Sequence, residues 1–349
     1  MKQITIISLA AIFVLALALI AARPAVSGPI CDGFSNDTAL IQAELDTKAV
    51  VTLPAGVCGV TTLTFNRSNV SLIGAGNSAT VLRAYAGATI LLSLGITEPV
   101  ARVTVKDMLI DCANQAGVVG LKANSPVQQT NSLYLEDLQI DNCPGGALIF
   151  QGVGNSWVRN LIGSNNGAVA GAVPAVSLQK AASGVTTNSN HFYGLDMESC
   201  KYSCLFVGPG VDANIFTSTI LDGGPAVLGM EVQGSQNLFF GLVGGLGGNG
   251  DFIRFSTAPG ALGRLNQFHG VRFDYDPSAT SGRVINLENT AGAAGLNSVF
   301  DLAVLTLPAG TTMVRDLEAN GNFIINARTR SGQAGTLFDI TNLATVVLP

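Results

Sequence analysis

The sequence has few charged and few aromatic side chains. Of its 349 residues, 12% are Asp, Glu, Lys or Arg and 6% are Phe, Trp or Tyr, with one tryptophan and two histidines. The formal net charge is −5. This charge argues against a nucleic-acid partner, because such proteins normally present a basic patch. The six cysteines and two histidines show no spacing typical of a zinc site.

Long apolar runs are absent except at the N-terminus. After Met1 and Lys2, residues 4–22 are apolar apart from Thr5 and Ser8. A charged start followed by an apolar stretch and small residues is typical of a secretory signal peptide. We therefore predict a signal peptide over residues 1–28, a secreted protein, either extracellular or periplasmic, and no membrane contact after cleavage. The alternative is an uncleaved membrane anchor, since the run is just long enough to span.

The sequence contains a repeated motif. An Asn followed by alternating apolar residues recurs at Asn190, Asn214, Asn237, Asn266 and Asn297, in steps of 24, 23, 29 and 31 residues. A period of 20 to 50 residues indicates a solenoid, propeller or array. Within each repeat the apolar residues alternate with period two, which excludes helical repeats.

Two earlier segments show the repeating unit more clearly. VTVKDMLIDCA from Val103 aligns with LYLEDLQIDNC from Leu133, and each indicates a strand, a bend at an acidic residue and a second strand. A variable loop and a third strand follow, as at residues 148–151. Three strands per turn predict an all-β, single-stranded right-handed parallel β-helix, a three-sided solenoid of about ten coils spaced about 4.8 Å apart. We expect it to fill residues 29–349 as one domain.

The segment after residue 28 predicts an N-terminal cap. Asn36 or Asp37 can begin a short amphipathic helix that carries Leu40, Ile41 and Leu45. Solenoids need such an element to shield the apolar end of the first coil.

This N-terminal region resembles a known superfamily. The run from Asp32-Gly33 through Asn36-Asp37-Thr38, the helix, VTLPAG from Val51 and VSLIGAG from Val70 is similar to the N-terminal signature of the pectate-lyase-like superfamily. The similarity covers about residues 31–85, and beyond them only the coil pattern supports it. The resemblance implies a right-handed β-helix and, usually, work on an acidic polysaccharide, without fixing a reaction.

The active-site signatures of the superfamily's enzymes are missing from this chain. It has no Gly-His-Gly or Asp-Asp pair of the polygalacturonase kind, no Trp-Ile-Asp-His of the pectate lyase kind and no Asp-Pro-His of the alginate epimerase kind. No catalytic residue can therefore be transferred from those families.

Two outward columns of the first strand are candidates for substrate binding. Aligning the coils places Thr104, Tyr134, Trp157 and His191 in one row, where a flat series of ring faces would pack on sugars. The alternative is that stacked aromatics only stabilise neighbouring strands. The second row contains Lys106, Glu136, Arg159 and Tyr193. Lys106 and Arg159 could bind uronate carboxylates, or the row is a salt-bridge ladder.

A third column, at the end of the second strand, is acidic. Asp111 aligns with Asp141, and Glu198 aligns with Asp222. Such pairs can act as general acid and base on a glycosidic bond. They can instead bind calcium, with Asp111 and Asp141 as the predicted metal ligands. A third alternative is that they cap turns by accepting hydrogen bonds from backbone N–H groups. The sequence requires no cofactor, and calcium is the metal ion that these acids would suit.

Catalysis, if present, is predicted over residues 190–224. A lyase would use His191, Tyr193 or Lys201 as its base, and a hydrolase would use Glu198 with Asp222. A reserve group is His269, Arg272, Asp274, Tyr275 and Asp276. Two functions remain open: a secreted lyase or glycoside hydrolase acting on a uronate-containing polysaccharide, and a non-catalytic glycan-binding or surface-structural β-helix.

Cysteines and the C-terminus yield two further expectations. In an exported chain disulfides are expected. The alignment places Cys112 and Cys143 one coil apart, Cys200 and Cys204 are close enough in sequence to close a local loop, and Cys31 could pair with Cys58, with buried free thiols as the alternative. The chain shows no evident cap before Pro349, so the last coil could be covered by a second copy, giving a homo-oligomer.

Overall fold

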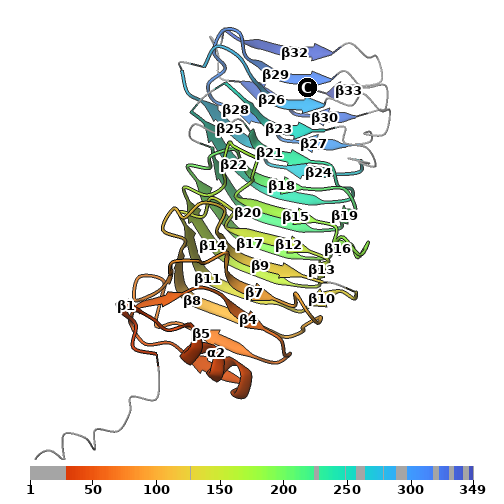
Figure 1. The fold of residues 1–349 in the computed structure, drawn as a ribbon. Helices are drawn as coiled ribbons and strands as arrows, with labels where there is room; N and C mark the ends of the chain where they lie inside the picture. Colours follow the sequence, from red (N-terminus) through yellow and green to blue (C-terminus); the bar gives the residue numbers. More distant parts are fainter. Residues whose placement is uncertain are drawn as a thin grey trace, which may run out of the picture.

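The computed structural model describes residues 29–349 except 126, 224–227, 248, 257–263, 278, 288–296, 317–321, 330–333, 341–345 and 349. These residues form a rod of stacked strands with a short helix at the N-terminal end (Figure 1). The predicted signal peptide lies outside them. None of the helices in this described part is long and apolar enough to cross a membrane.

Parallel strands form three sheets that run along the rod. Sheet B has 11 strands, one per coil, in agreement with the expected number: β4 (Leu63–Phe65), β7 (Ile90–Leu94), β9 (Val119–Asn124), β12 (Leu148–Gln151), β15 (Val176–Gln179), β18 (Ser203–Val207), β21 (Leu228–Val232), β23 (Asp251–Phe255), β26 (Arg283–Leu287), β29 (Thr312–Asp316) and β32 (Thr336–Ile340). Sheet C has four short strands: β10 (Thr130–Asn131), β13 (Val153–Gly154), β16 (Thr187–Asn188) and β19 (Val211–Asp212).

Sheet A contains 18 strands and carries the repeated motif. They are β1 (Asp32–Asn36), β2 (Val50–Thr52), β3 (Gly56–Val60), β5 (Ser71–Ile73), β6 (Thr80–Ala84), β8 (Thr104–Asp111), β11 (Tyr134–Asp141), β14 (Trp157–Ser164), β17 (His191–Glu198), β20 (Ile215–Asp222), β22 (Leu238–Leu246), β24 (Gln267–His269), β25 (Arg272–Tyr275), β27 (Ser298–Phe300), β28 (Ala303–Val304), β30 (Phe323–Ile325), β31 (Arg328–Thr329) and β33 (Val346–Leu348).

The long strands of sheet A bend at one residue with left-handed backbone. Asp107, Asp137, Asn160, Gly194 and Ser218 occupy this position from β8 to β20, with φ between 51° and 69°. Gly, Asn and Asp tolerate this conformation best, which explains the acidic residue at the predicted bend. The two halves of each strand and sheet B are the three sides of the β-helix.

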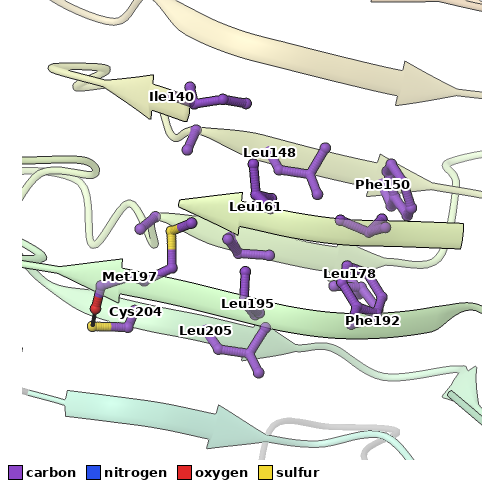
Figure 2. Close-up of a cluster of buried hydrophobic side chains, with 14 of the residues drawn as sticks. Ile140, Leu148, Phe150, Leu161, Leu178, Phe192, Leu195, Met197, Cys204 and Leu205 are labelled. Atoms are coloured by element: carbon purple, nitrogen blue, oxygen red, sulfur yellow. Dashed lines mark hydrogen bonds between the residues drawn. The ribbon is translucent and has the colours of Figure 1, made fainter. Parts of the chain in front are cut away.

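Stacked apolar columns fill the interior. The inward position of the first half-strand carries Phe192, Phe216, Phe239 and Phe268 on successive coils. Their rings stack with centroids 4.7, 4.7 and 4.4 Å apart, because the coil spacing is close to the stacking distance. Figure 2 shows Phe192 with the leucines that sheets A and B contribute to this core.

The repeated asparagine forms a buried ladder beside this core. Asn214 accepts a hydrogen bond at Oδ1 from the backbone N–H of Asn190 (3.1 Å) and another from its side-chain amide (2.9 Å). The same backbone contact, at 3.0–3.1 Å, recurs through Asn237, Asn266, Asn297 and Asn322. The sequence marked the period with these residues, and the structure shows that they pair backbone groups at a corner buried from water.

The N-terminal cap forms as predicted, with one difference. Helix α2 (Thr38–Thr47) buries Ile41 and Leu45. Leu40 was expected on the same face but is 41% exposed, because adjacent helical residues point about 100° apart whereas residues four apart share a face. All three predicted disulfides are present: Cys31–Cys58, Cys112–Cys143 and Cys200–Cys204. The oligomer contact at the last coil stays a prediction.

Candidate functional site

The register confirms the three outward columns that the alignment proposed. Tyr134 pairs with Thr104 and Trp157, and Trp157 pairs with His191. On this face a hollow of about 470 Å³ opens in the middle coils. The residues that line it are Tyr134, Leu135, Glu136, Trp157, Val158, Arg159 and Tyr193. Three of the four predicted substrate-binding residues therefore come together, and the fourth, Lys106, does not line the hollow.

Aromatic rings dominate the exposed lining of the hollow. Tyr134, Trp157 and Tyr193 are 45%, 51% and 53% exposed, unusually high for such large side chains. They are held on three adjacent strands, β11, β14 and β17, whose neighbouring residues Leu135 and Val158 point inward and are buried. The alternation of the strand therefore fixes the rings on the outer surface.

The orientation of the rings differs from the expected flat row. Trp157 and His191 stack on each other at 4.4 Å with an interplanar angle of 15°, so these ring faces point along the rod axis rather than outward. The physical reason is the coil spacing, which again matches ring stacking. Tyr134, one coil before Trp157, makes no ring contact with it in the described structure, and both residues line the hollow.

Charged side chains in the second column are paired with one another. Arg159 Nη1 lies 3.2 Å from Glu136 Oε1, and Lys106 Nζ lies 3.2 Å from Asp107 Oδ2. Asp137 accepts a hydrogen bond of 2.7 Å from Asn160 Nδ2. Both cations that were predicted to bind substrate carboxylates thus already contact acids of the protein.

A group of acids lies at the far end of β17 and β20. Glu198 and Asp222 are exposed register neighbours, as predicted. Asp196, two residues before Glu198, is half-buried in a column between Ile162 and Ile220. Burial raises the pKa of the Asp196 carboxyl, and repulsion from Glu198 and Asp222 raises it further. Sequence reasoning missed Asp196, although the alignment places this acid between Ile162 and Ile220.

The predicted catalytic residues are divided between these two places. Tyr193 lines the hollow and His191 stacks on Trp157 beside it. Glu198 is five residues beyond Tyr193, about 16 Å along the strand, past the bend at Gly194. Lys201 lies after the strand, where its Nζ donates to Asn165 Oδ1 (3.0 Å). A single site containing all five residues is therefore not formed.

The reserve group does not converge either. His269 is held between Phe240 and Phe300, with ring centroids 5.0 and 4.6 Å away. Tyr275 is buried, and its hydroxyl donates to the Gly250 carbonyl (3.0 Å). Burial raises the pKa of this hydroxyl, which keeps it neutral. Arg272 and Asp274 are exposed on the same strand.

The predicted calcium ligands have partners of their own. Asp111 contacts Arg83 Nε (3.0 Å) and accepts from the Ala113 N–H (2.9 Å). Asp141 accepts from the Ser164 N–H (2.9 Å) and from Gln139 Nε2 (2.6 Å). These contacts match the turn-capping alternative, and the calcium site stays a prediction. A different trio, Cys31, Asp37 and Cys58, is also compact, but its two sulfurs form a disulfide.

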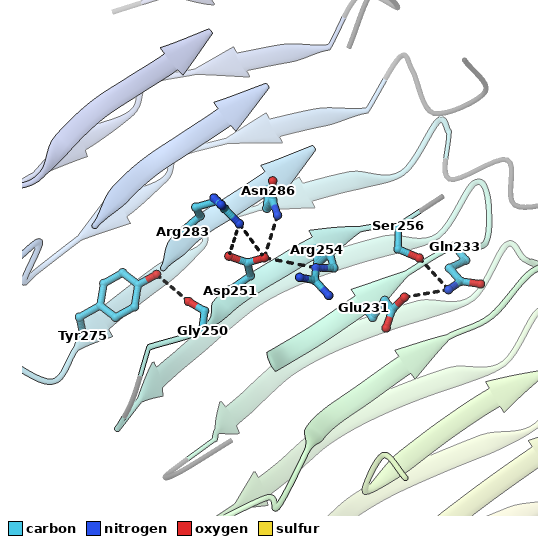
Figure 3. Close-up of polar contacts among 9 residues, drawn as sticks. All are labelled: Glu231, Gln233, Gly250, Asp251, Arg254, Ser256, Tyr275, Arg283 and Asn286. Atoms are coloured by element: carbon cyan, nitrogen blue, oxygen red, sulfur yellow. Dashed lines mark hydrogen bonds and ion pairs between the residues drawn. The ribbon is translucent and has the colours of Figure 1, made fainter. Parts of the chain in front are cut away.

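Two further hollows, which the sequence did not indicate, adjoin on the outer face of sheet B. One of about 200 Å³ includes Tyr202, Glu231 and Gln233, and the other, of about 470 Å³, includes Lys180 and Pro209, with Gln179 and Phe206 common to both. Figure 3 shows Glu231 and Gln233 near a buried carboxylate, Asp251. Asp251 contacts Arg254 (3.2 Å), Arg283 (3.4 Å) and Asn286 (2.7 Å). A carboxylate with these partners is a satisfied structural group.

Comparison with known proteins supports the fold. No protein-family model matches the chain, and no curated protein was found to be similar in sequence. Among solved structures, the ORF18 protein of Geobacillus virus E2 is 17% identical with a TM-score of 0.58, over 92% of this chain and 60% of that one. An alginate lyase from Paenibacillus sp. is 12% identical with a TM-score of 0.56, over 86% and 95%.

A thermostable alpha-1,3-glucanase from Streptomyces thermodiastaticus is 14% identical with a TM-score of 0.54, over 93% of this chain and 69% of that one. The chain spans 60% of the viral protein, so that protein contains parts with no counterpart here. At these identities the similarity is one of fold. This chain therefore shares the right-handed parallel β-helix fold of these proteins, the fold that its repeats predicted.

Proposed function

We propose that this protein binds a polysaccharide on the outer face of sheet A. The observation that carries the proposal is the hollow of about 470 Å³ that Tyr134, Trp157 and Tyr193 line. Sugars present C–H faces that pack on aromatic rings, while tyrosine hydroxyls and the adjacent Glu136 and Arg159 offer hydrogen bonds to sugar hydroxyls.

Three other observations support the proposal. The rod offers equivalent positions about every 4.8 Å, so that a polymer can lie along successive coils. The alginate lyase and the glucanase that share the fold are named for polysaccharides, which is support by analogy only. The predicted signal peptide and the three disulfides favour an extracellular or periplasmic location.

Retention of the mature protein on a panel of immobilised neutral and acidic polysaccharides tests the proposal. We expect at least one polymer to retain the wild type and Trp157→Ala to lose most of that retention. Tyr85→Ala is the matched control, because Tyr85 is another exposed aromatic, 38% accessible, that does not line the hollow. Equal retention of the Trp157 and Tyr85 variants would exclude the hollow as the binding site.

Glycoside hydrolysis is the second candidate function, and Asp196 is the observation that favours it. A carboxyl with a raised pKa beside other carboxyl groups suits the arrangement in which one acid protonates the leaving oxygen while another acts as base or nucleophile. Asp196 would be the acid, with Glu198 or Asp222 as its partner. A lyase would instead need a base at the hollow, which Tyr193 lines and beside which His191 stacks on Trp157.

These reactions give different products. New reducing ends alone indicate hydrolysis, and reducing ends with ultraviolet absorbance from unsaturated sugars indicate a lyase. We expect Asp196→Asn to abolish hydrolysis, and either Glu198→Gln or Asp222→Asn to do so as well, according to which residue is its partner. Glu44→Gln, a change at an ion pair of helix α2, should leave hydrolysis intact. Binding without any product would leave the non-catalytic function.

A further inference from the structure

The charges around the hollow bear on which polysaccharide it accepts. Arg159 is the one cationic side chain among the described residues that line it. Its guanidinium contacts Glu136 at 3.2 Å, with the two side chains 62% and 37% exposed. Lys106, the next cation in the column, contacts Asp107 at 3.2 Å. Lys106 and Arg159 are the two cations that were predicted to bind uronate carboxylates, and both are paired.

The balance of charge in this patch is negative. Lys106 and Arg159 contribute two positive charges, whereas Asp107, Glu136 and Asp137 contribute three negative ones, which gives a formal net charge of −1. A uronate arriving at Arg159 would meet the Glu136 carboxylate on the same guanidinium. It would have to displace Glu136 or lie beside it, and like charges in contact oppose binding.

A neutral sugar meets no such opposition. Arg159 and Glu136 share one contact, through Nη1 and Oε1. In the described structure the other N–H groups of Arg159 and the Oε2 atom of Glu136 make no hydrogen bond, so they can donate to and accept from sugar hydroxyls. The aromatic rings add contacts that do not depend on charge.

We infer that the hollow selects neutral, hydroxyl-rich sugar units over uronates and that Glu136 sets this preference. This inference rests on the proposed function. Sugar hydroxyls can hydrogen-bond to the Arg159–Glu136 ion pair as it stands. A carboxylate must displace Glu136 or lie beside it, against charge repulsion. Removing the charge of Glu136 frees the guanidinium for a bidentate carboxylate contact.

A pair of polymers with one backbone provides the test: polygalacturonate and its methyl-esterified form, with a neutral glucan as a third ligand. For the wild type at low salt we expect weaker binding of the free acid than of the ester. Glu136→Gln should raise affinity for the acid about two- to fivefold, the size of an exposed ion pair's contribution, and leave the ester nearly unchanged. High salt should shrink the difference.

Controls separate this inference from the proposed function. Glu44→Gln removes a carboxylate from another ion pair, on helix α2, and should change neither affinity. A wild type that prefers the acid, or a Glu136→Gln variant with an unchanged acid-to-ester ratio, would overturn the inference while leaving glycan binding in place. Failure to bind any of the three ligands or the wider panel would overturn both.

Discussion

Two rows of aromatic side chains on sheet A, one inside the rod and one outside, overlap on β17. The inner row contains Phe192, Phe216, Phe239 and Phe268, stacked without a break at 4.4–4.7 Å. The outer row of Tyr134, Trp157 and His191 lies on β11, β14 and β17, one position before the inward residue, and in it only Trp157 and His191 stack, at 4.4 Å. A separate outer stack, one position after the inward residue, joins Phe240, His269 and Phe300 further along the rod. Both rows have the same coil spacing, so spacing alone does not decide their continuity.

The difference lies in what surrounds each row. Inside, every face of a ring must contact protein, because an unfilled gap in a packed core loses both burial and dispersion energy. Outside, water can fill a gap, so the row can end at Trp157 and leave Tyr134 apart from it. The hollow opens beside this interruption. A β-helix can therefore create a binding site by interrupting a stack that its geometry would otherwise continue.

The largest expected effect comes from interrupting the inner row. Phe216→Ala should lower the free energy of unfolding by about 3–5 kcal/mol, because it removes a fully buried ring and leaves a cavity between Phe192 and Phe239. The shift of the urea unfolding midpoint measures it. A loss below about 1 kcal/mol would mean that the coils close over the gap, and would contradict the comparison.

The asparagine ladder should come next. Asn214→Ala leaves the backbone N–H and the side-chain amide of Asn190 without their acceptor, in a buried position. A loss of about 1–3 kcal/mol is the usual consequence for such groups. Asn214→Ser is the matched control, since Ser156 occupies the corresponding position and its Oγ accepts the Leu133 N–H at 3.0 Å. Serine should therefore restore part of the loss, and equal losses would argue against the ladder.

Much of this architecture could be predicted because it repeats. The asparagines fixed the period, the alternation fixed which residues point inward, and the two together fixed the register of Tyr134, Trp157 and His191. The Cys112–Cys143 disulfide followed from the same alignment. Register requires only the backbone, and the backbone is nearly identical from coil to coil.

What could not be predicted depends on side-chain rotation. The alignment places Arg159 next to Glu136, but whether they form a pair or both reach outward is decided by χ angles. The direction in which the ring faces of Trp157 and His191 point is also decided by their χ angles. Asp196 was missed for another reason: its raised pKa arises from burial beside Ile162 and Ile220, and the sequence alone does not measure burial.

Asp196 provides a smaller, pH-dependent effect on the outer surface. Its folded-state pKa is raised, so its favourable contribution is present below the unfolded pKa and is lost as pH rises through the folded value. Asp196→Asn should thus be more stable than the wild type at pH 7, with the advantage shrinking toward pH 4. Unfolding midpoints of both proteins across this range measure it. A constant difference would show that titration of Asp196 is not involved.

The smallest expected effect is the one that separates the two rows most sharply. Trp157 and His191 stack in the open, with water on one side, so a double-mutant cycle with Trp157→Ala and His191→Ala should yield a coupling energy of only about 0.5 kcal/mol. The cycle Phe216→Ala with Phe239→Ala should couple more strongly, since the two cavities would be contiguous. If the outer pair coupled as strongly as the inner one, the outer rings would be structural, and the loss of glycan binding in Trp157→Ala would need to be attributed to a disturbed strand. Weak coupling together with lost binding assigns the exposed tryptophan to the ligand, because its removal then changes recognition without changing the rod.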